Sequence, residues 1–347
     1  MKSAEMKYFV LIALWLVFTA FSASAQKEDH RYIVVSYNVE NLFDTADAPL
    51  FDDDAFTPEG SMKWTYDRYE KKLTDLARVI LSIPERELPA VIGLAEVENR
   101  KVLEDLITTR GLRRGDYEIV HEESEDPRGI ECALLYRPDL FTYRSHEIIP
   151  IEDPVDPDYR YRGILHVRGS GPDGSSLHLY INHWKSRRGG EDETERQRMF
   201  SAITLRRNLD MLLSRESGFR VIIMGDFNDE PTNRSITNGL SASNKRRNIN
   251  LGDHYNLYYD LHNMEGEGSY YYQGSWTMLD QIIVSYNLLD QKRGLSTGFD
   301  GGKILKEEWM MGEHEKDGSS IPASTYRGEE YRGGPSDHLP LYVVFTW

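Results

Sequence analysis

The fold of this chain is decided by the stretch Val221-Ile222-Ile223-Met224-Gly225-Asp226-Phe227-Asn228-Asp229-Glu230-Pro231. Its four consecutive apolar residues predict a buried strand. Gly225 lets the backbone turn, and Asp226 and Asn228 follow at the strand end where open α/β sheets bind their ligands. An acid and an amide on rigid backbone can hold a water molecule in a fixed position. The alternative is an Asx-type turn in which both side chains cap local amides, and this stretch alone favours neither.

The N-terminus has the features of a secretory signal peptide. Lysines precede an apolar run over residues 8–21, and Ala23-Ser24-Ala25 provides the small residues of a cleavage site. The run is shorter than the roughly 20 residues of a transmembrane helix, and no cysteine directly follows it to carry a lipid anchor. We therefore expect cleavage after residues 1–25 and a secreted or periplasmic protein, residues 26–347, without a stable membrane anchor.

The charge and the cysteine count restrict the class of protein. The net charge of −16 argues against a protein that coats nucleic acid non-specifically, because such proteins carry a net basic surface. It allows an enzyme that binds a few phosphates with local arginines and a divalent metal. The single cysteine, Cys132, excludes an intrachain disulfide, and its apolar surroundings in 131–136 predict a buried small hydrophobe.

Apolar runs alternate with amphipathic segments along the chain and predict strands with helices between them. Helices are expected at 66–81, 99–107 and 193–214, and strands at 31–37, 90–94, 117–121, 131–136, 141–149, 164–168, 177–181, 221–224, 277–285 and 341–345. Residues 286–335 lack periodicity and predict a long surface excursion. Because no repeat or low-complexity linker interrupts the sequence, we expect one domain in which two packed sheets are covered by helices.

Polar side chains lie at the ends of several expected strands: Asn38, Glu40, Glu96, His183, Asp226, Asn228, Asp337 and His338, with Asp280 early in its own strand. Each has a structural explanation when taken alone. A lone histidine is usually satisfied within the core, and an aspartate before a turn usually caps it. Their occurrence together at the strand ends of one chain indicates a functional site.

Six motifs resemble, in their order, those of the endonuclease/exonuclease/phosphatase superfamily: Tyr37-Asn38-Val39-Glu40, Ala95-Glu96, Asn182-His183, Gly225-Asp226-Phe227-Asn228, Leu279-Asp280 and Ser336-Asp337-His338. That superfamily includes deoxyribonuclease I, exonuclease III, inositol-polyphosphate phosphatases and neutral sphingomyelinases. The resemblance runs from about residue 32 to the C-terminus. It implies an α/β fold, a four-layered sandwich with two packed mixed β-sheets flanked by helices, and metal-dependent cleavage of a phosphate ester.

The resemblance also implies a metal site. Glu96 would be the main Mg²⁺ ligand with Asn38 beside it, and Asp337 would support His338 or a second metal. Carboxylate and amide oxygens suit a hard cation, and such a cation neutralises the charge of a phosphate ester. Mn²⁺ is the alternative metal. The acidic segment 44–59 is expected to be a solvated loop, with Ca²⁺ as a candidate structural ion.

The catalytic roles follow from the same resemblance. Asp226 and Asn228 would orient or deprotonate the attacking water. His183 and His338 would contact the phosphate or the leaving oxygen, and Asp280 would hold one of these histidines. A histidine tuned by a buried carboxylate serves as proton donor or acceptor near neutral pH.

Basic side chains follow His183 in the sequence. Lys185, Arg187 and Arg188 form our candidate clamp for the substrate phosphate, because a forked guanidinium matches phosphate geometry. Arg198, in the following helix, could instead pair with glutamates on a solvated helix face, and for this residue we favour that alternative.

Together these features predict a secreted Mg²⁺-dependent nuclease or phosphodiesterase, acting as a monomer on DNA, RNA or another phosphate ester. An alternative keeps the site but changes the substrate to a phosphomonoester or a phospholipid head group, as in inositol-phosphate phosphatases or sphingomyelinases. The net acidity favours a small substrate, whereas the arginines favour a polyanion. The intact set of acids and histidines argues against a binding module that has lost catalysis.

Overall fold

The computed structural model describes residues 30–347 except 125, 217, 251 and 290–293. The expected signal peptide lies outside the described residues. Arg31–Trp347 form a compact unit that holds both large sheets. None of the described helices combines the length and the apolar character needed to cross a membrane.

The first sheet has six strands in the order β14-β19-β1-β2-β4-β3. Its strands are β1 Arg31–Leu42, β2 Val91–Val97, β3 Glu118–His121, β4 Glu131–Tyr136, β14 Gly302–Ile304 and β19 Leu341–Thr346. β1 and β2 run parallel, and β19 and β4 flank them in the opposite direction. The parallel pair brings the C-terminal ends of β1 and β2, with Asn38 and Glu96, to the same edge of the sheet.

The second sheet has seven strands in the order β5-β6-β7-β8-β13-β10-β9. Its strands are β5 Thr142–Ile149, β6 Ile164–Ser170, β7 Ser176–His183, β8 Arg220–Asp226, β9 Ala242–Ser243, β10 His254–Asn256 and β13 Asp280–Ser285. β7 and β8 are parallel, with His183 beside Asp226. β13 is antiparallel to β8 and begins with Asp280, which lies on the other side of Asp226. The ladder therefore places three candidate site residues in one row.

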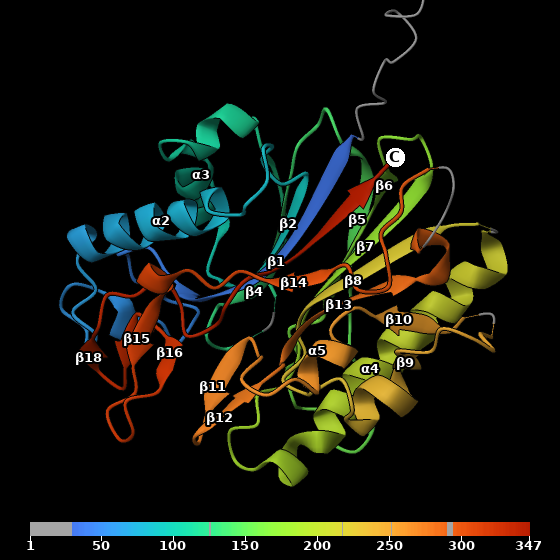
Figure 1. The fold of residues 1–347 in the computed structure, drawn as a ribbon. Helices are drawn as coiled ribbons and strands as arrows, with labels where there is room; N and C mark the ends of the chain where they lie inside the picture. The colour runs from blue at the N-terminus through green and yellow to red at the C-terminus, as the bar shows by residue number, and fades with distance from the viewer. Residues whose placement is uncertain (1–29, 125, 217, 251, 290–293) are drawn as a thin grey trace, which may run out of the picture. The chain divides into compact units, whose positions relative to one another are not determined.

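Helices cover the outer faces of both sheets (Figure 1). α2 Tyr66–Leu81 and α3 Arg100–Thr108 pack on the first sheet, and α4 Glu191–Arg215 packs on the second. In β8, Val221 and Ile223 face the α4 core, whereas Ile222 and Met224 face the core between the sheets. Both faces of this strand are covered, which explains its unbroken apolar run. The expected four-layered α/β sandwich is confirmed.

A short helix, three hairpins and several helical turns of the described residues lie outside the two large sheets. They are the short helix α5 Tyr259–His262, the hairpins β11 Tyr270–Tyr272 with β12 Ser275–Thr277, β15 Met311–Glu313 with β16 Ser320–Pro322 and β17 Tyr326–Arg327 with β18 Glu330–Tyr331, and helical turns at Asp54–Phe56, Leu112–Gly115, Ser235–Gly239, Tyr286–Leu288 and Glu308–Met310. The expectation of a plain surface excursion over 286–335 needs correction, because β14 from this segment joins the first sheet beside β19. Strands of two or three residues are too short to show an alternating pattern.

Strand ends near the polar motifs also differ from expectation. β1 continues to Leu42, through the motif that was expected to follow it, and β8 includes Asp226 as its last residue. The expected strand 277–285 divides into β12 and β13. In these places polar side chains are buried within the strand, as Ser36 and Asn38 are, so apolar runs underestimate the strand length.

Two buried histidines on β6 and β7 share a hydrogen bond. His166 Nε2 lies 2.9 Å from His178 Nδ1, and His166 Nδ1 lies 3.0 Å from Glu147 Oε1. Burial lowers the pKa of His166 to about 4 and also lowers the pKa of His178, from an ordinary value of 6.5. The unfolded chain therefore binds these protons more readily than the folded chain. Their contribution to stability is present above about pH 6.5 and is lost as the pH falls toward 4.

We expect the free energy of unfolding to fall between pH 6.5 and pH 4, by up to about 1.4 kcal/mol per pH unit for each histidine. His166→Gln removes one of these titrations, so its stability deficit relative to wild type should shrink as the pH falls. Urea unfolding at pH 7.5, 6.5, 5.5 and 4.5 measures the trend. A constant deficit of His166→Gln across this range contradicts the explanation.

Candidate active site

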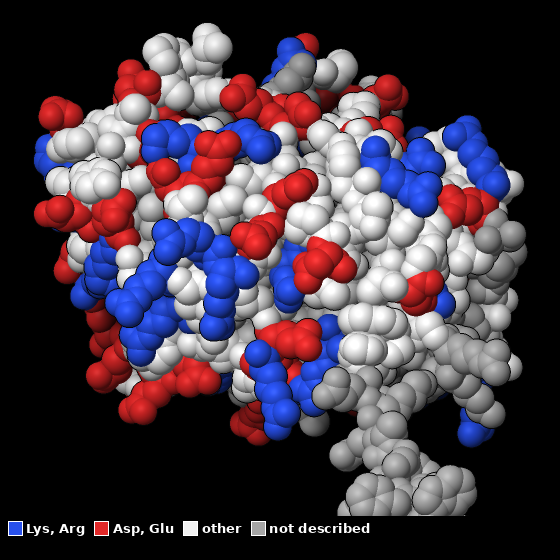
Figure 2. All heavy atoms as spheres, turned by 90° about the horizontal axis from the view of Figure 1, so that it is seen from above, with Lys and Arg blue, Asp and Glu red and all other residues white. Residues whose placement is uncertain are grey.

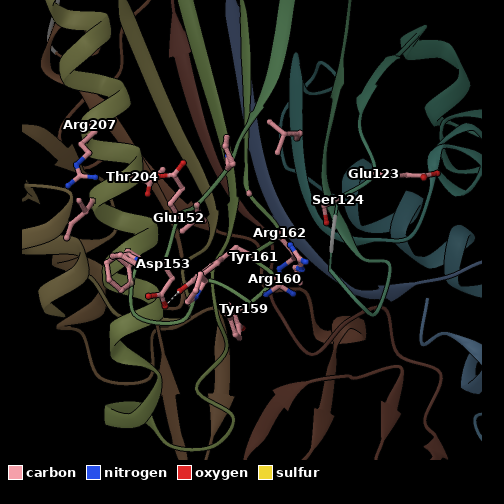
Figure 3. A pocket seen from close by; sticks show the side chains of 18 residues that line it. Glu123, Ser124, Glu152, Asp153, Tyr159, Arg160, Tyr161, Arg162, Thr204 and Arg207 are labelled. Carbon is pink, nitrogen blue, oxygen red and sulfur yellow. Dashed lines mark hydrogen bonds between the residues drawn. The ribbon is translucent and has the colours of Figure 1, made fainter. Parts of the chain in front are cut away.

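The polar strand ends surround one pocket of about 310 Å³. Acids and histidines from both sheets line it: Glu96, His183, Asp226, Asp337 and His338. A larger cavity of about 780 Å³ lies between the 150–163 loop and α4, and no histidine lines it (Figure 3). Because acid–base chemistry needs paired titratable groups, we place the candidate active site in the smaller pocket.

Asp226 is buried at the centre of the site and is held from both sheets. Its Oδ2 accepts hydrogen bonds from Asn38 Nδ2 at 3.1 Å and from Asn228 Nδ2 at 3.2 Å, and its Oδ1 accepts one from the Asn228 amide at 2.9 Å. Burial raises the pKa of Asp226 to about 6, and the charge of Asp280 acts in the same direction. Asp226 is thus a fixed carboxylate with a raised proton affinity.

Gly225 sets the backbone that presents Asp226. Its φ of 138° lies in a region that favours glycine. A Cβ at this position would lie 1.9 Å from the carbonyl oxygen of Asn182 on the neighbouring strand. Asn228 also has a positive φ, 49°. The glycine allows β8 to lie close against β7, and the left-handed Asn228 turns the chain after the strand, so that Asp226 and Asn228 line the same pocket.

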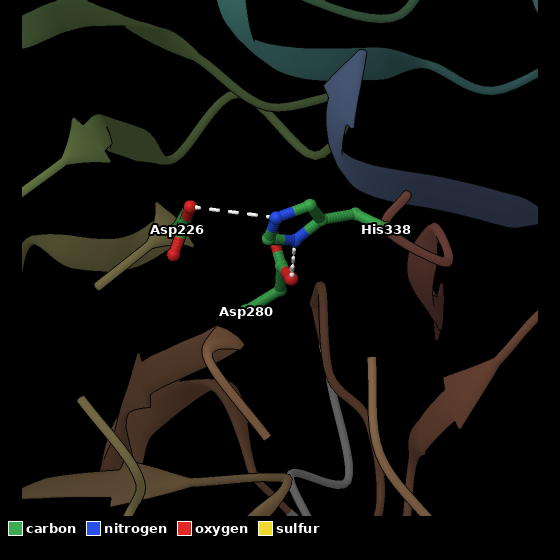
Figure 4. A group of neighbouring side chains, drawn as sticks. All are labelled: Asp226, Asp280 and His338. Carbon is green, nitrogen blue, oxygen red and sulfur yellow. Dashed lines mark hydrogen bonds and ion pairs between the residues drawn. The ribbon is translucent and has the colours of Figure 1, made fainter. Parts of the chain in front are cut away.

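Asp280 and His338 form a buried pair beside Asp226 (Figure 4). His338 Nδ1 lies 2.7 Å from Asp280 Oδ2, and His338 Nε2 lies 3.9 Å from Asp226 Oδ2. Burial lowers the pKa of His338, but the charge and hydrogen bond of Asp280 outweigh it and raise this pKa well above its usual value. The Tyr270 ring stacks on the imidazole at a centroid distance of 4.6 Å, which further suits a cation.

His183 is the second buried histidine of the pocket, and its pKa is shifted in the opposite direction from that of His338. Its Nε2 lies 3.6 Å from Glu96 Oε1 and 3.8 Å from Asp226 Oδ2, and its Nδ1 is buried without a partner. Burial lowers the pKa of His183 well below its ordinary value, and the charge of Arg162 contributes in the same direction. The site therefore pairs a neutral imidazole with a charged one around Asp226.

Glu96 and Asn38 lie together as the sequence predicts. Asn38 Nδ2 is 3.4 Å from Glu96 Oε1, and the amide of Asn41 donates to Glu96 Oε2 at 2.9 Å. The Asn38 Oδ1 accepts from the Glu40 amide at 3.0 Å. Asp337 lines the same pocket, with Oδ1 at 4.0 Å from His338 Nε2. These oxygen-rich side chains are the donor type that a hard divalent cation requires.

Among the described histidines, cysteines, aspartates and glutamates, only Asp226, Asp280 and His338 bring three ligand atoms within 4.8 Å of one another. His338 is a poor ligand, because Asp280 engages its Nδ1 and raises its pKa. We therefore favour the side of the pocket that holds Glu96 for a metal.

The Ca²⁺ expectation for 44–59 finds no such described group. Two carboxylates of this segment bind backbone, because Asp44 and Asp53 accept the amides of Ala46 and Ala48. The Ca²⁺ site stays a prediction.

The three expected phosphate-binding cations occupy different environments. Arg187 lines the pocket, but its guanidinium binds the Asn228 carbonyl oxygen at 2.8 Å and Asn233 Oδ1 at 3.1 Å, so it anchors the loop after β8. Arg188 also lines the pocket and is exposed, without a partner among the described residues. Lys185 needs correction, because its ammonium lies over the Tyr159 ring at 5.6 Å and does not line the pocket. The chain turns after β7, which directs this side chain away.

Arg198 also requires a correction. It is fully buried rather than paired on a solvated face, and its Nε donates to Asp229 Oδ1 at 2.6 Å. Its other nitrogens donate to the Glu191 carbonyl oxygen and the Thr194 hydroxyl. Asp229 additionally accepts from the Ser235 hydroxyl at 2.5 Å. This buried network fixes the loop after β8 to α4, and its residues carry no distinguishing pattern in the sequence.

Sequence reasoning also missed the support of β7. Arg162 lines the large cavity (Figure 3) and donates from Nε to the His183 carbonyl oxygen at 3.1 Å and from Nη2 to that of Trp184 at 3.1 Å. Its Nη1 binds Asp126 at 3.0 Å. Arg128 lines the active-site pocket, and its Nε lies 3.6 Å from Oδ1 of the same aspartate.

This fold and this site define the class of metal-dependent phosphoesterases. The sequence matches the Endonuclease/Exonuclease/phosphatase family over residues 33–346. The chain therefore belongs to this family, as its motifs predict. A comparison with curated proteins found no match.

Solved structures from several organisms share the fold. A mannosyl-6-phosphatase from Bacteroides thetaiotaomicron is 17% identical, with a TM-score of 0.56 over 91% of this chain and 100% of that one. D. rerio TDP2 complexed with single-strand DNA product is 17% identical, with a TM-score of 0.53 over 91% and 99%. The human Nocturnin catalytic domain is 17% identical, with a TM-score of 0.53 over 91% and 95%. These similarities demonstrate the shared fold.

Asp229→Ala should destabilise the protein by about 3–5 kcal/mol, because it leaves the Arg198 guanidinium buried without its carboxylate. Urea unfolding at pH 7 measures the loss. The matched control is Glu104→Ala at the exposed pair with Arg100, which should change stability by less than about 1 kcal/mol. Equal effects of the two substitutions would show that the buried pair does not anchor this loop.

Proposed function

We propose that the protein is a secreted divalent-metal-dependent phosphodiesterase, most specifically a nuclease, that hydrolyses its substrate by in-line attack of water. The observation that carries this proposal is the arrangement around Asp226, a fixed carboxylate between a neutral His183 and a charged His338. Membership of the family supports hydrolysis of phosphate esters. The choice of phosphodiester and the export are our proposal, and the export depends on the N-terminal sequence.

The donor set of the pocket fits a hard cation. Glu96 and Asp337 would hold Mg²⁺ or Mn²⁺ through carboxylate oxygens, with Asn38 beside them orienting Glu96 through its Nδ2, and the bound ion would neutralise charge on the phosphate and on the leaving oxygen. Nothing in the side-chain chemistry of these residues selects a softer metal, because the group contains no thiolate.

The protein side chains position the water and the phosphate. Asp226 accepts a proton from the attacking water, while Asn228 holds the carboxylate in place through two hydrogen bonds. In-line displacement puts water and leaving oxygen on opposite sides of phosphorus. Because His338 Nε2 is only 3.9 Å from Asp226 Oδ2, the imidazolium and the carboxylate serve the same side. His338 and His183 therefore donate hydrogen bonds to phosphate oxygens rather than to the leaving oxygen.

A second candidate function is hydrolysis of a phosphomonoester at the same site. The observation that favours it is the shortage of available cations, because Arg187 is engaged by the protein and Arg128 lies near Asp126. Figure 2 views the end of the first sheet where β1 begins and β19 finishes, away from these residues, and there basic side chains form separate groups among acidic ones. A polyanion normally needs several phosphate contacts, so a small ester would suit this pocket.

The deciding experiment compares three substrates with the mature chain, residues 26–347, and Mg²⁺. They are closed-circular DNA, a chromogenic phosphodiester and a chromogenic phosphomonoester. We expect nicked DNA and diester hydrolysis, with Asp226→Asn slower by about 10²–10⁴-fold because it removes a positioned base. Release from the monoester with intact DNA would establish the second candidate instead. Inactivity on all three substrates would contradict both proposals.

Chelation tests the metal separately. EDTA should abolish hydrolysis, and added Mg²⁺ or Mn²⁺ should restore it, because oxygen ligands hold the ion reversibly. Glu96→Gln should require a higher Mg²⁺ concentration for half-maximal activity, whereas Glu104→Gln, far out on the surface of α3, should titrate like wild type. Undiminished hydrolysis in excess chelator would remove the metal role assigned to Glu96.

A further inference from the structure

Lys72 on α2 carries a buried ammonium outside the active-site pocket. Only 2% of this residue is exposed. Its Nζ donates to the Glu40 carbonyl oxygen at 3.0 Å, the Thr325 hydroxyl at 2.5 Å and the Pro335 carbonyl oxygen at 2.7 Å. A buried charge is retained only where such partners satisfy it. Lys72 therefore ties α2 at once to β1 and to two points in the segment 325–337, which we name the strap.

Glu40 binds the same strap through backbone amides. Its Oε2 accepts from the amides of Thr325 at 2.7 Å and Asp337 at 2.9 Å, and its Oε1 accepts from the amide of Tyr326 at 3.1 Å. The φ of Glu40 is +50°, an unusual value for a residue with a side chain. Such a conformation is strained and persists where surrounding contacts fix it.

The strap leads directly into the active site. The Ser336 hydroxyl donates to the Asn38 carbonyl oxygen at 2.8 Å and accepts from the His338 amide at 3.0 Å. On the far side of His338, the Leu339 amide donates to the Ser269 carbonyl oxygen at 2.7 Å. The Ser269 hydroxyl in turn accepts from the Asp280 amide at 3.0 Å. The backbone at His338 is thus fixed on one side by Ser336 of the strap and on the other by Ser269, which also binds the start of β13.

We propose that Lys72 and Glu40 are positioning residues that lock the strap onto β1 and so hold His338 in hydrogen-bond reach of Asp280. The inference depends on the role of His338 in the proposed function. It gives the long segment between β13 and β19 a purpose, because this segment returns the chain to the site in a fixed orientation. Loss of the lock displaces His338, and a misplacement of about 1 Å can lower the rate by about 10²-fold.

The test is Lys72→Met, which keeps the length of the side chain and removes its three hydrogen bonds. We expect kcat to fall by about 10–100-fold while KM stays within about threefold, because His338 acts mainly on charge that develops in the transition state. Lys72→Arg, which can donate to the same oxygens, should recover most of the rate. Leu76→Ala, on the same helix and in the apolar core, should lose stability yet keep the wild-type kcat.

A second measurement reads the strap without activity. Hydrogen exchange of peptides covering 323–340 should be at least about tenfold faster in Lys72→Met, because amides bound to Glu40 become free to open. Peptides from β8 should exchange as in wild type. If Lys72→Met does not fold, Thr325→Val removes one of the same contacts at nearly constant volume and takes its place.

Each outcome then has one meaning. Unchanged exchange in 323–340 overturns the lock. Faster exchange with an unchanged kcat overturns its connection to His338. A loss of kcat that Leu76→Ala reproduces would show general destabilisation and also overturn the inference. A wild-type chain that is inactive on all three substrates contradicts the proposed function instead, and the exchange measurement still decides whether the lock exists.

Discussion

The hydrogen bond between Asn38 and Asp226 joins the two sheets at the active site. The core between the sheets is apolar and therefore non-directional, so it resists separation but permits sliding. A buried carboxylate allows less movement between the sheets, because it must keep its hydrogen-bond donors. Asp226 takes them from Asn38 in the first sheet and from Asn228 beyond its own strand. The rest of the site is arranged around this requirement, since the ladder of β7, β8 and β13 places His183 and Asp280 on either side of the same carboxylate.

Much of the fold could be predicted from the sequence, for identifiable reasons. α2 has the expected bounds, because its apolar residues follow one helical face and bury it on the first sheet. β8 could be recognised because both of its faces are covered. The small strands β9, β10 and β14 could not, because two or three residues carry no period. Their position depends on pairing with neighbours that are distant in the sequence.

The residues of the site likewise divide into those that the sequence could predict and those that it could not. Its acids and histidines could be found because they follow or begin recognisable strands, and the structure brings His183, Asp226 and His338 to one pocket. The supporting residues could not be found. Arg198 reads as one more charge on a polar helix, although Asp229 holds it in the core. Lys72 reads likewise as a surface lysine. The sequence of one helix shows only how its residues are spaced. Whether a charged side chain on that helix is buried depends on the partner that another segment places opposite it.

The position of β19 in the first sheet has a consequence for when the protein becomes complete. β1, the first strand among the described residues, pairs with β19, the last of them, and Arg31 lies opposite Thr346. His338 lies just before that last strand. During synthesis, an emerging chain can form most of the second sheet while the centre of the first sheet still lacks a neighbour. Contacts of such long range also form slowly. The order of the strands therefore leaves the site incomplete until the segment that carries His338 has been made and β19 has paired with β1.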